Sequence, residues 1–249
     1  MDRKVVIIPT YNEKENIAKI IHAIFGIEGD YHVLVIDDGS PDGTAGIVKD
    51  LQKEFESGKK ENYAGRLHLI ERSGKLGLGT AYITGFKWAL KEGYDYIFEM
   101  DADFSHNPED LPRLWKACAE DGADLAIGSR YCKGISVIHW PIGRVIMSYY
   151  ASVYVRTVLG MKVYDTTAGF KCYRRQMLEK VDLDRVKMYG YGFQIEMKYT
   201  CWKLGGKIQE VPVIFVDRTE GTSKMSGSIF GEAFWGVIGL KFRKIRAKA

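Results

Sequence analysis

The chain has 249 residues, of which 46% are hydrophobic and 27% are charged, enough apolar material for the core of one globular domain. This composition excludes intrinsically disordered and fibrous classes of protein. The formal net charge is only +4, and five of the last nine residues are Lys or Arg, so the rest of the chain is nearly neutral. A nucleic-acid-binding protein would spread its positive charge over one face, so the sequence argues against nucleic acid as a partner.

Membrane-spanning and secretory segments are not indicated either. No uncharged apolar stretch approaches the roughly 20 residues that a transmembrane helix needs, and the first residues show no apolar core of a signal peptide. The four cysteines lie far apart without a CxxC pair, which indicates reduced thiols rather than a zinc site or a disulfide framework. We therefore expect a cytoplasmic protein.

The first half of the chain alternates short β-rich runs with helical patterns. The predicted strands cover residues 4–8, 32–36, 67–71, 96–100 and 125–128, and the predicted helices cover residues 13–25, 44–55, 80–91 and 109–119. This alternation predicts an α/β fold with a mostly parallel, doubly wound sheet and helices on both faces. Because ligands of such sheets lie outside the carboxyl ends of the strands, residues 9–13, 37–43 and 101–106 are expected to be neighbours in space.

After residue 130 the pattern changes. We expect a loop over residues 131–140, an apolar helix over 142–159, a turn-rich stretch over 165–175, a helix over 193–204, a strand over 207–216 and a polar loop over 217–228. A last helix begins at about residue 229. The chain has no internal repeat or low-complexity linker, so we expect one main domain over residues 1–228 and an appended amphipathic, basic helix over residues 229–249.

Acidic side chains stand at two strand ends. In MDADFSH, Asp101 and Asp103 follow an apolar run and flank one small residue. Residues i and i+2 of an extended segment point to the same side, so both carboxylates can approach one cation. Mg²⁺ takes one or two carboxylates and completes its shell with phosphate oxygens and water. The pair therefore predicts a clamp for a metal-bound diphosphate, and a solvated turn before the next helix is the alternative.

The other acidic strand end is VIDDGSPDGT, and PTYNE follows the first predicted strand. Asp37 or Asp38 can accept hydrogen bonds from ribose hydroxyls or a base edge, as acidic strand ends do in nucleotide-binding α/β folds. The ring and polar groups of PTYNE suit a nucleoside. A plain turn before a helix is the alternative for the acidic segment, because Asp, Gly, Ser and Pro all favour turns.

Six segments, taken together and in order, resemble the dolichol-phosphate (polyprenol-phosphate) mannosyltransferases of inverting glycosyltransferase family 2. They are PTYNE, IDDGSPDGT, KLGLGTAY, MDADFSHNPE, GSRY and VDRTEGTSK, within residues 4–228. The resemblance implies a GT-A fold, with residues 1–228 as the catalytic domain. It further implies transfer of mannose from GDP-mannose to a polyprenyl or dolichyl phosphate, with inversion to a β-linked product. Mg²⁺ or Mn²⁺ would be the cofactor, and the enzyme would lie peripherally on the cytoplasmic face of a membrane.

The same resemblance assigns roles to individual residues. The nucleoside would contact Pro9, Tyr11, Glu13, Ile36 and Asp38, and the sugar diphosphate would contact Asp101, Ala102 and Asp103. Asp103 is the favoured metal ligand, with Asp101 and Ser105 beside it. Some relatives carry Gln in place of Ser105, and because a hydroxyl is a poorer ligand, water can substitute there. Arg218 and Lys224 would lie on a loop over the donor diphosphate, where an arginine fork and a lysine charge neutralise the leaving group. Asp101, Asp103, Arg218 and Lys224 are thus the catalytic candidates.

A separate group of side chains is the candidate site for the acceptor phosphate. Arg144 and Ser148 are four residues apart on one helix face, and Arg130 ends a strand near the acidic cluster, where it would also contact the donor. Two arginines and a hydroxyl suit a phosphate monoester, and a structural ion pair with Asp101 is the alternative for Arg130. A phosphate monoester has a second pKa of about 6, so this nucleophile needs no general base. The sequence indeed places no histidine convincingly at the centre of the site.

Some assignments stay open in the sequence. Contacts with sugar hydroxyls and plain packing are both compatible with four residues, which are Thr166, Thr167, Gln194 and Glu196. A related transferase using another donor such as UDP-glucose is the second functional candidate. A non-catalytic nucleotide-sugar sensor or membrane adaptor is the third, although it would need neither Asp103 nor the basic loop over 217–228.

The C-terminal segment carries an aromatic stripe and a basic end. Trp235, Ile238, Phe242 and Ile245 recur at steps of three and four residues and so share one side of a helix. A helix of this kind fits a segment that lies among anionic lipid headgroups. Docking on a membrane-spanning partner subunit or on the domain's own core are the alternatives.

Overall fold

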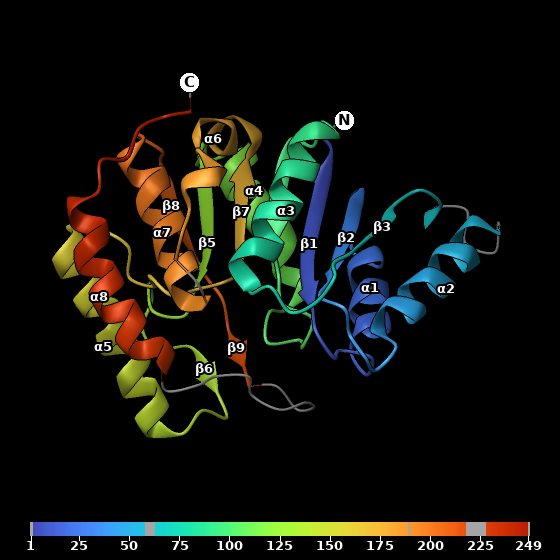
Figure 1. Ribbon diagram of the computed structural model, residues 1–249, viewed down its shortest axis with the longest axis horizontal. Helices are drawn as coiled ribbons and strands as arrows, with labels where there is room; N and C mark the ends of the chain where they lie inside the picture. The colour runs from blue at the N-terminus through green and yellow to red at the C-terminus, as the bar shows by residue number, and fades with distance from the viewer. Residues whose placement is uncertain (1, 58–62, 189, 218–227, 249) are drawn as a thin grey trace.

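A seven-stranded sheet runs through the centre of the molecule (Figure 1). The computed structural model describes residues 2–57, 63–188, 190–217 and 228–248, and for residues 228–233 it describes only the backbone. The strands are β1 (Lys4–Thr10), β2 (Tyr31–Asp37), β3 (Leu67–Glu71), β4 (Tyr96–Glu99), β5 (Leu125–Ser129), β7 (Lys171–Arg174) and β8 (Ile208–Pro212). Their order is β3-β2-β1-β4-β7-β5-β8, and only β7 runs antiparallel to its neighbours.

Helices cover both faces of this sheet, as the sequence predicts. One face packs against α1 (Ile17–Phe25), α2 (Thr44–Glu56) and α4 (Leu111–Ala119), and the other against α3 (Leu78–Lys91), α5 (Ile142–Leu159), α6 (Arg175–Lys180), α7 (Gly190–Lys203) and α8 (Ser228–Phe242). Along β1 the buried side chains alternate, with Val5 and Ile7 facing α3 and Val6 and Ile8 facing α1. A strand covered on both faces is apolar along most of its length, which explains the run over residues 5–8 in β1.

Two sequence predictions for the second half are wrong in detail. Residues 165–175 were expected to be a turn-rich stretch without a strand of the sheet, yet they contain β7, and α6 follows directly. The single strand expected over 207–216 is divided between β8 in the main sheet and β9 (Phe215–Val216), which pairs with β6 (Val137–Ile138) in a separate two-stranded sheet. Short 3₁₀ turns at Pro108–Asp110 and Leu183–Arg185 complete the described elements.

The C-terminal helix α8 packs on the domain and still exposes aromatic rings. Val237 and Leu240 are buried in the core, and α8 lies against α5 and α7 (Figure 1). The Tyr154 hydroxyl on α5 donates a 3.0 Å hydrogen bond to the backbone carbonyl of Phe234. On the opposite side of α8, Trp235 is 70% and Phe242 79% exposed. The helix therefore docks on the core of its own domain, one of the alternatives that the sequence left open, and still exposes aromatic rings on its other side. Among the described residues no helix is long and apolar enough to cross a membrane.

Candidate active site

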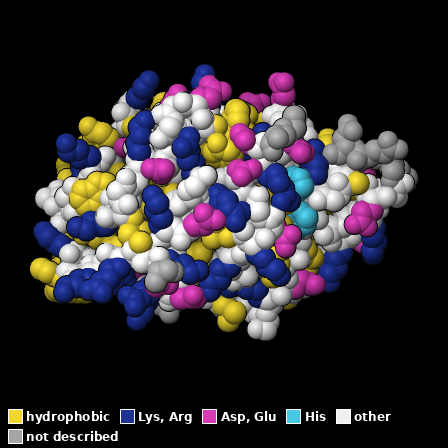
Figure 2. Space-filling view, turned by 90° about the horizontal axis from the view of Figure 1, so that it is seen from above, with side chains coloured by type: hydrophobic (Ala, Val, Ile, Leu, Met, Phe, Trp, Pro, Cys, Tyr) yellow, Lys and Arg dark blue, Asp and Glu magenta, His cyan; other side chains and the backbone are white. Residues whose placement is uncertain are grey.

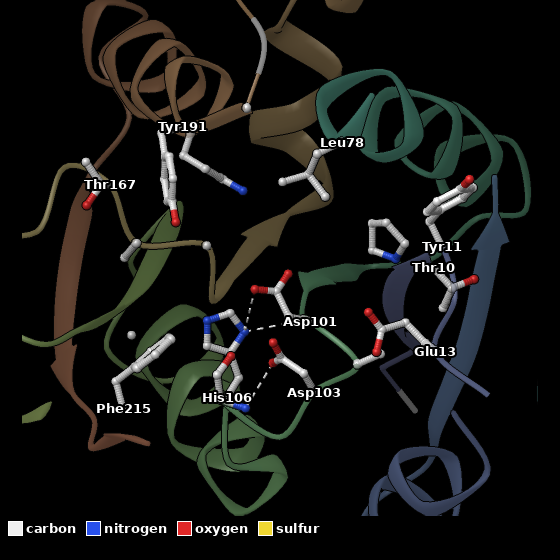
Figure 3. Close-up of a pocket in the computed structure, with 18 of the residues that line it drawn as sticks. Thr10, Tyr11, Glu13, Leu78, Asp101, Asp103, His106, Thr167, Tyr191 and Phe215 are labelled. Atoms are coloured by element: carbon white, nitrogen blue, oxygen red, sulfur yellow. Dashed lines mark hydrogen bonds and ion pairs between the residues drawn. The ribbon is translucent and has the colours of Figure 1, made fainter. Parts of the chain in front are cut away.

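The carboxyl ends of the central strands open on one cavity of about 530 Å³. Ten of the residues expected from the sequence line it: Pro9, Tyr11, Glu13, Asp38, Asp101, Ala102, Asp103, Ser105, Arg130 and Arg144. Figure 3 shows Tyr11 and Glu13 on one side, Thr167, Tyr191 and Phe215 on the other, and the acidic loop between them. A volume of this size fits a ligand of several hundred daltons. Arg218 and Lys224 lie outside the described residues.

The two aspartates at the end of β2 have different surroundings. The Asp37 side chain accepts hydrogen bonds from the hydroxyls of Thr10 at 2.9 Å and Ser40 at 2.6 Å, which tie β2 to neighbouring loops. Asp38 lines the cavity, and Nε of Arg72 donates to its Oδ1 at 2.6 Å. The geometry therefore favours Asp38 over Asp37 for ligand contacts. Ile36 is fully buried in the core and does not line the cavity.

A strained loop presents the acidic pair. Backbone N–H of Ser105 donates to Oδ1 of Asp103 at 3.1 Å, while the intervening Phe104 has a φ of +58°. Positive φ is uncommon for a bulky residue and costs on the order of 1–3 kcal/mol, a kind of strain that concentrates at functional sites. Tyr82, buried in the core, donates from its hydroxyl to Oδ1 of Asp101 at 3.5 Å. Asp103 is thus held by a bond within its own loop and Asp101 by a longer contact from the core, and both carboxylates line the cavity (Figure 3).

Asp101 and Asp103 can supply some, but not all, of the ligands of a hard divalent cation. No group of three or more His, Cys, Asp or Glu that could hold a metal occurs among the described residues. Two carboxylates in an open cavity nevertheless suit Mg²⁺ or Mn²⁺, because such ions take their remaining ligands from phosphate oxygens and water. The Ser105 side chain is nearly buried, although the residue lines the cavity. The site therefore fits a metal that arrives with a diphosphate.

His106 is fixed beneath the acidic loop. Its Nδ1 accepts the backbone N–H of Asp101 at 3.1 Å, and its ring stacks on Phe170 with centroids 5.0 Å apart. Burial lowers the pKa of His106 to about 4, so the imidazole is neutral near pH 7. With Nδ1 accepting, the proton of the neutral ring lies on Nε2. His106 is therefore placed to shape the loop rather than to accept a proton from a ligand.

Arg130 is held by a buried carboxylate that the sequence did not identify. Its Nε donates to Oδ2 of Asp165 at 2.7 Å and its Nη2 to Oδ1 at 2.6 Å, while Nη2 also reaches Oγ1 of Thr167 at 2.8 Å. The alternative of an ion pair with Asp101 is therefore wrong. Although burial alone would raise it, the pKa of Asp165 is lowered because Arg130 stabilises the carboxylate. Nη1 of Arg130 takes no part in these bonds, and Arg130 lines the cavity.

Trp140 joins the two arginines of the acceptor prediction. The guanidinium of Arg144 lies 4.0 Å, and that of Arg130 5.3 Å, from the Trp140 ring centroid. Arg144 also pairs with Asp217 at 2.9 Å. The indole Nε1 of Trp140 is buried without a hydrogen-bond partner among the described residues, although Trp140 lines the cavity. Ser148, by contrast, accepts a hydrogen bond from the Tyr131 hydroxyl at 2.8 Å and does not line the cavity.

The structure divides the four candidates for sugar contacts. Gln194 and Thr167 line the cavity. Thr166 is fully buried and donates to Ser152, and Glu196 is buried on α7, where it accepts the backbone N–H of Met188 at 2.7 Å. Cavity residues to which the sequence analysis gave no role include Lys75, Trp140, Tyr191, Val213 and Phe215. Lys75 lies 5.0 Å from the ring centroid of Tyr11 and stands in KLGLGTAY, so the motif itself could have indicated it.

A family model described as Glycosyl transferase family 2 matches residues 5–182. The chain belongs to glycosyl transferase family 2. The chain is 45% identical over 242 residues to the polyprenol monophosphomannose synthase of Mycolicibacterium smegmatis, and the alignment covers 95% of this chain and 88% of that protein. It is 43% identical over 251 residues to the undecaprenyl-phosphate mannosyltransferase of Micrococcus luteus, covering 99% of this chain and 98% of that one.

Solved structures of more distant proteins share the fold. The glucosyl-3-phosphoglycerate synthase of Mycobacterium tuberculosis, in complex with Mn²⁺, UDP and glucosyl-3-phosphoglycerate, superposes with a TM-score of 0.64 at 20% identity, covering 96% of this chain and 78% of that one. The same enzyme with Mg²⁺ and UDP gives 0.62 at 21% identity. The sheet and its two helical layers are thus a GT-A fold, as the resemblance implied.

Proposed function

We propose that this glycosyltransferase transfers mannose from GDP-mannose to the phosphate of a polyprenyl or dolichyl phosphate. The supporting observation is that one cavity holds an acidic metal-type loop, Asp101 to Asp103, together with the anchored guanidinium of Arg130. The former suits a nucleoside diphosphate with its cation, and the latter suits a phosphate monoester. The names of the two relatives, a polyprenol monophosphomannose synthase and an undecaprenyl-phosphate mannosyltransferase, agree with this pairing.

The reaction needs positioning and charge compensation more than proton transfer. An oxygen of the acceptor phosphate attacks the anomeric carbon of mannose, the bond from that carbon to the diphosphate breaks, and GDP leaves with the bonding electrons. Attack from the side opposite the leaving group inverts the anomeric centre and gives the β-linked product. The nucleophile is already anionic near neutral pH, since its second pKa is about 6. The placement of His106, with Nδ1 engaged by the Asp101 backbone, agrees with a reaction that needs no general base.

Charges on both sides of the cavity have separate tasks in this proposal. Asp103, with Asp101 beside it, would hold Mg²⁺ or Mn²⁺, which supplies Lewis-acid stabilisation of the departing diphosphate. The glucosyl-3-phosphoglycerate synthase of M. tuberculosis, which shares the fold, was solved in complex with UDP and Mn²⁺ and in complex with UDP and Mg²⁺. Arg218 and Lys224 would add positive charge at the diphosphate. Arg130 and Arg144 would orient the acceptor phosphate, with the indole N–H of Trp140 as a further donor.

The position of the long lipid acceptor follows from an exposed apolar surface. On α5 the exposed side chains are Ile142, Ile146, Met147 and Tyr150, and α8 adds Phe234, Trp235 and Phe242. Arg144 on the same helix α5 lines the cavity. Figure 2 shows Lys and Arg side chains beside hydrophobic ones at the left end of the molecule, where α5 and α8 lie in Figure 1. The chain end from residue 241 adds Lys241, Lys244 and Arg246. Apolar rings among cations suit an anionic membrane surface, and we place the enzyme on its cytoplasmic face.

A donor panel tests the proposal. The full chain is incubated with a short polyprenyl phosphate and labelled GDP-mannose, UDP-glucose or GDP-glucose, each with Mg²⁺, with Mn²⁺ or with a chelator. We expect a labelled lipid from GDP-mannose that disappears with the chelator. A product from UDP-glucose alone would replace the donor assignment by the second candidate. Absence of any lipid-linked product, with nucleotide binding intact, would instead support the non-catalytic sensor.

A further inference from the structure

Gln194 is an amide that is almost wholly buried in the wall of the cavity. It lies in the first turns of α7 and is only 3% exposed, yet it lines the cavity. Its Nε2 lies 3.6 Å, and Cε1 of His106 lies 3.5 Å, from the place where a Cβ would stand at Gly169. These are ordinary van der Waals distances, so Nε2 lies directly beside the loop that carries Gly169, a residue that also lines the cavity.

A buried ion pair determines which end of this amide faces the cavity. Lys171 on β7 stands directly opposite Glu99 on β4, and their Nζ and Oε1 atoms are 2.9 Å apart with both side chains fully buried. Nζ of Lys171 also donates to Oε1 of Gln194. An ammonium has donors only, so it can engage the amide oxygen and not the amide nitrogen. Oε1 is therefore turned toward the ion pair and Nε2 toward the cavity.

Tyr173 and Lys198 strengthen this arrangement from two directions. The Tyr173 hydroxyl donates to Oε1 of Glu99 at 2.7 Å, which fixes the carboxylate that holds Lys171. One turn along α7, Nζ of Lys198 donates to the carbonyls of Ala168 at 2.6 Å and Thr166 at 3.0 Å. These bonds attach the loop that carries Gly169 to the helix that carries Gln194. Reversal of the amide would bring two donors together in the interior and leave the Lys171 ammonium without this acceptor, which is unfavourable.

We propose that Nε2 of Gln194 donates a hydrogen bond to a hydroxyl oxygen of the transferred sugar and so contributes to the choice of sugar. This inference rests on the proposed nucleotide-sugar transfer. A neutral N–H donor recognises an oxygen without adding charge, and the charged parts of the ligand would be bound by Arg130 and by the cation that Asp103 would hold. Sites built to hydrogen-bond a hydroxyl discriminate strongly against ligands that lack it, because the protein group is then left unpaired.

The test combines two variants with donors that lack single hydroxyls. Gln194→Glu keeps an oxygen for Lys171 and removes the amide donor, and Gln194→Met removes both. Glu196→Gln is the matched control, because it makes the reverse exchange on the same helix outside the cavity. Rates of lipid mannosylation are measured with GDP-mannose and its 2-, 3-, 4- and 6-deoxy analogues. GDP binding and thermal melting of each variant report separately on the nucleotide site and on folding.

We expect one deoxy donor to lose about tenfold or more in kcat/KM with the wild-type chain and with Glu196→Gln. With Gln194→Met that same donor should react within about threefold of GDP-mannose, since the contact is already absent. Gln194→Glu can only accept from the sugar hydroxyl, so it should lower kcat/KM with GDP-mannose itself. A merely structural role would lower the rates of all donors in parallel and leave every deoxy penalty unchanged, which would overturn the inference. If the wild-type chain transfers no sugar at all, the proposed function fails instead.

Discussion

Replacement of Arg130 by Met removes one partner of the most buried ion pair at the cavity. The side chains of Arg130 and Asp165 are 7% and 0% exposed, and two bonds of 2.7 and 2.6 Å join them. Met replaces most of the arginine stem but leaves a carboxylate buried without its cation. Breaking a buried pair in this way costs about 3–5 kcal/mol of unfolding free energy. In a domain of this size each kcal/mol corresponds to about 2–4 °C, so we expect Tm to fall by about 6–20 °C.

The double variant Arg130→Met with Asp165→Asn identifies the cause. The Asn side chain still offers an oxygen to the backbone N–H of residue 130, a bond that measures 2.9 Å with Asp165, but it carries no charge. If the unpaired carboxylate causes the loss, the double variant should be more stable than Arg130→Met by at least about 1 kcal/mol. Thermal unfolding followed by circular dichroism at neutral pH measures both. A double variant as unstable as the single one would refute this reasoning.

Three further results are expected. Asp103→Asn should lower turnover by a factor of at least about 100, because the charge that would hold the cation is lost. Its Tm should be unchanged, because the amide oxygen can still accept the N–H of residue 105. Full activity of this variant would remove the metal assignment. Burial lowers the pKa of His32 to about 4, so the contribution of its neutral ring to the free energy of unfolding is complete above about pH 6.5 and falls as the pH approaches 4. Unfolding measured from pH 7 to 4 should therefore show a loss of stability that is less steep in His32→Asn. Equal slopes for the two proteins would contradict this. The double variant Trp235→Ser with Phe242→Ser should reduce the fraction of protein that sediments with anionic vesicles severalfold. Trp202→Ser, which removes an exposed ring on α7, should leave this fraction unchanged. Equal sedimentation of the double variant and Trp202→Ser would argue against α8 as the membrane-binding surface.

Shortening the chain before α8 is a poorer test of membrane binding than these point substitutions. Val237 and Leu240 are buried in the same core as α5 and α7. Removal of the helix would uncover that core, so lost binding could reflect unfolding. Trp235 and Phe242 lie on the exposed side, and their replacement leaves the buried contacts in place.

The parts of the fold that the sequence predicts well are those with a repeating local signal. Strands covered on both faces are continuous apolar runs, as in β1 and β2, and their polar ends mark the ligand edge of a parallel sheet. This is why segments such as 9–13 and 101–106, far apart in the chain, were correctly expected at one cavity. The stripe of Trp235 and Phe242 was likewise readable from helical spacing. The helix expected over residues 229–249 was wrong at its end, because α8 stops at Phe242 and Ile245, beyond it, packs partly buried against the core.

Long-range polar partners were not predictable because nothing local marks them. The strand β7 begins with Lys171, which is tolerated in the interior only because Glu99 stands opposite in the register, and a single sequence does not show that register. Asp165 is likewise separated by 35 residues from Arg130, and it lies in a stretch that resembles a turn.

The orientation of α8 was not predictable for a different reason. Its buried residues Val237 and Leu240 are no more apolar than the exposed Trp235 and Phe242, so periodicity alone could not decide which face of the helix packs inward.

Acceptor choice tests the central claim most directly. The cavity offers anchored guanidinium groups, and Nδ1 of its histidine, His106, is engaged by the Asp101 backbone, so we expect it to use a nucleophile that is already anionic. Labelled GDP-mannose with Mg²⁺ is supplied to the full chain with a polyprenyl phosphate or with the matching polyprenol of equal chain length. We expect labelled lipid from the phosphate only, with a β-linked mannosyl phosphate in the product. Comparable transfer to the alcohol, or failure with the phosphate, would contradict this account.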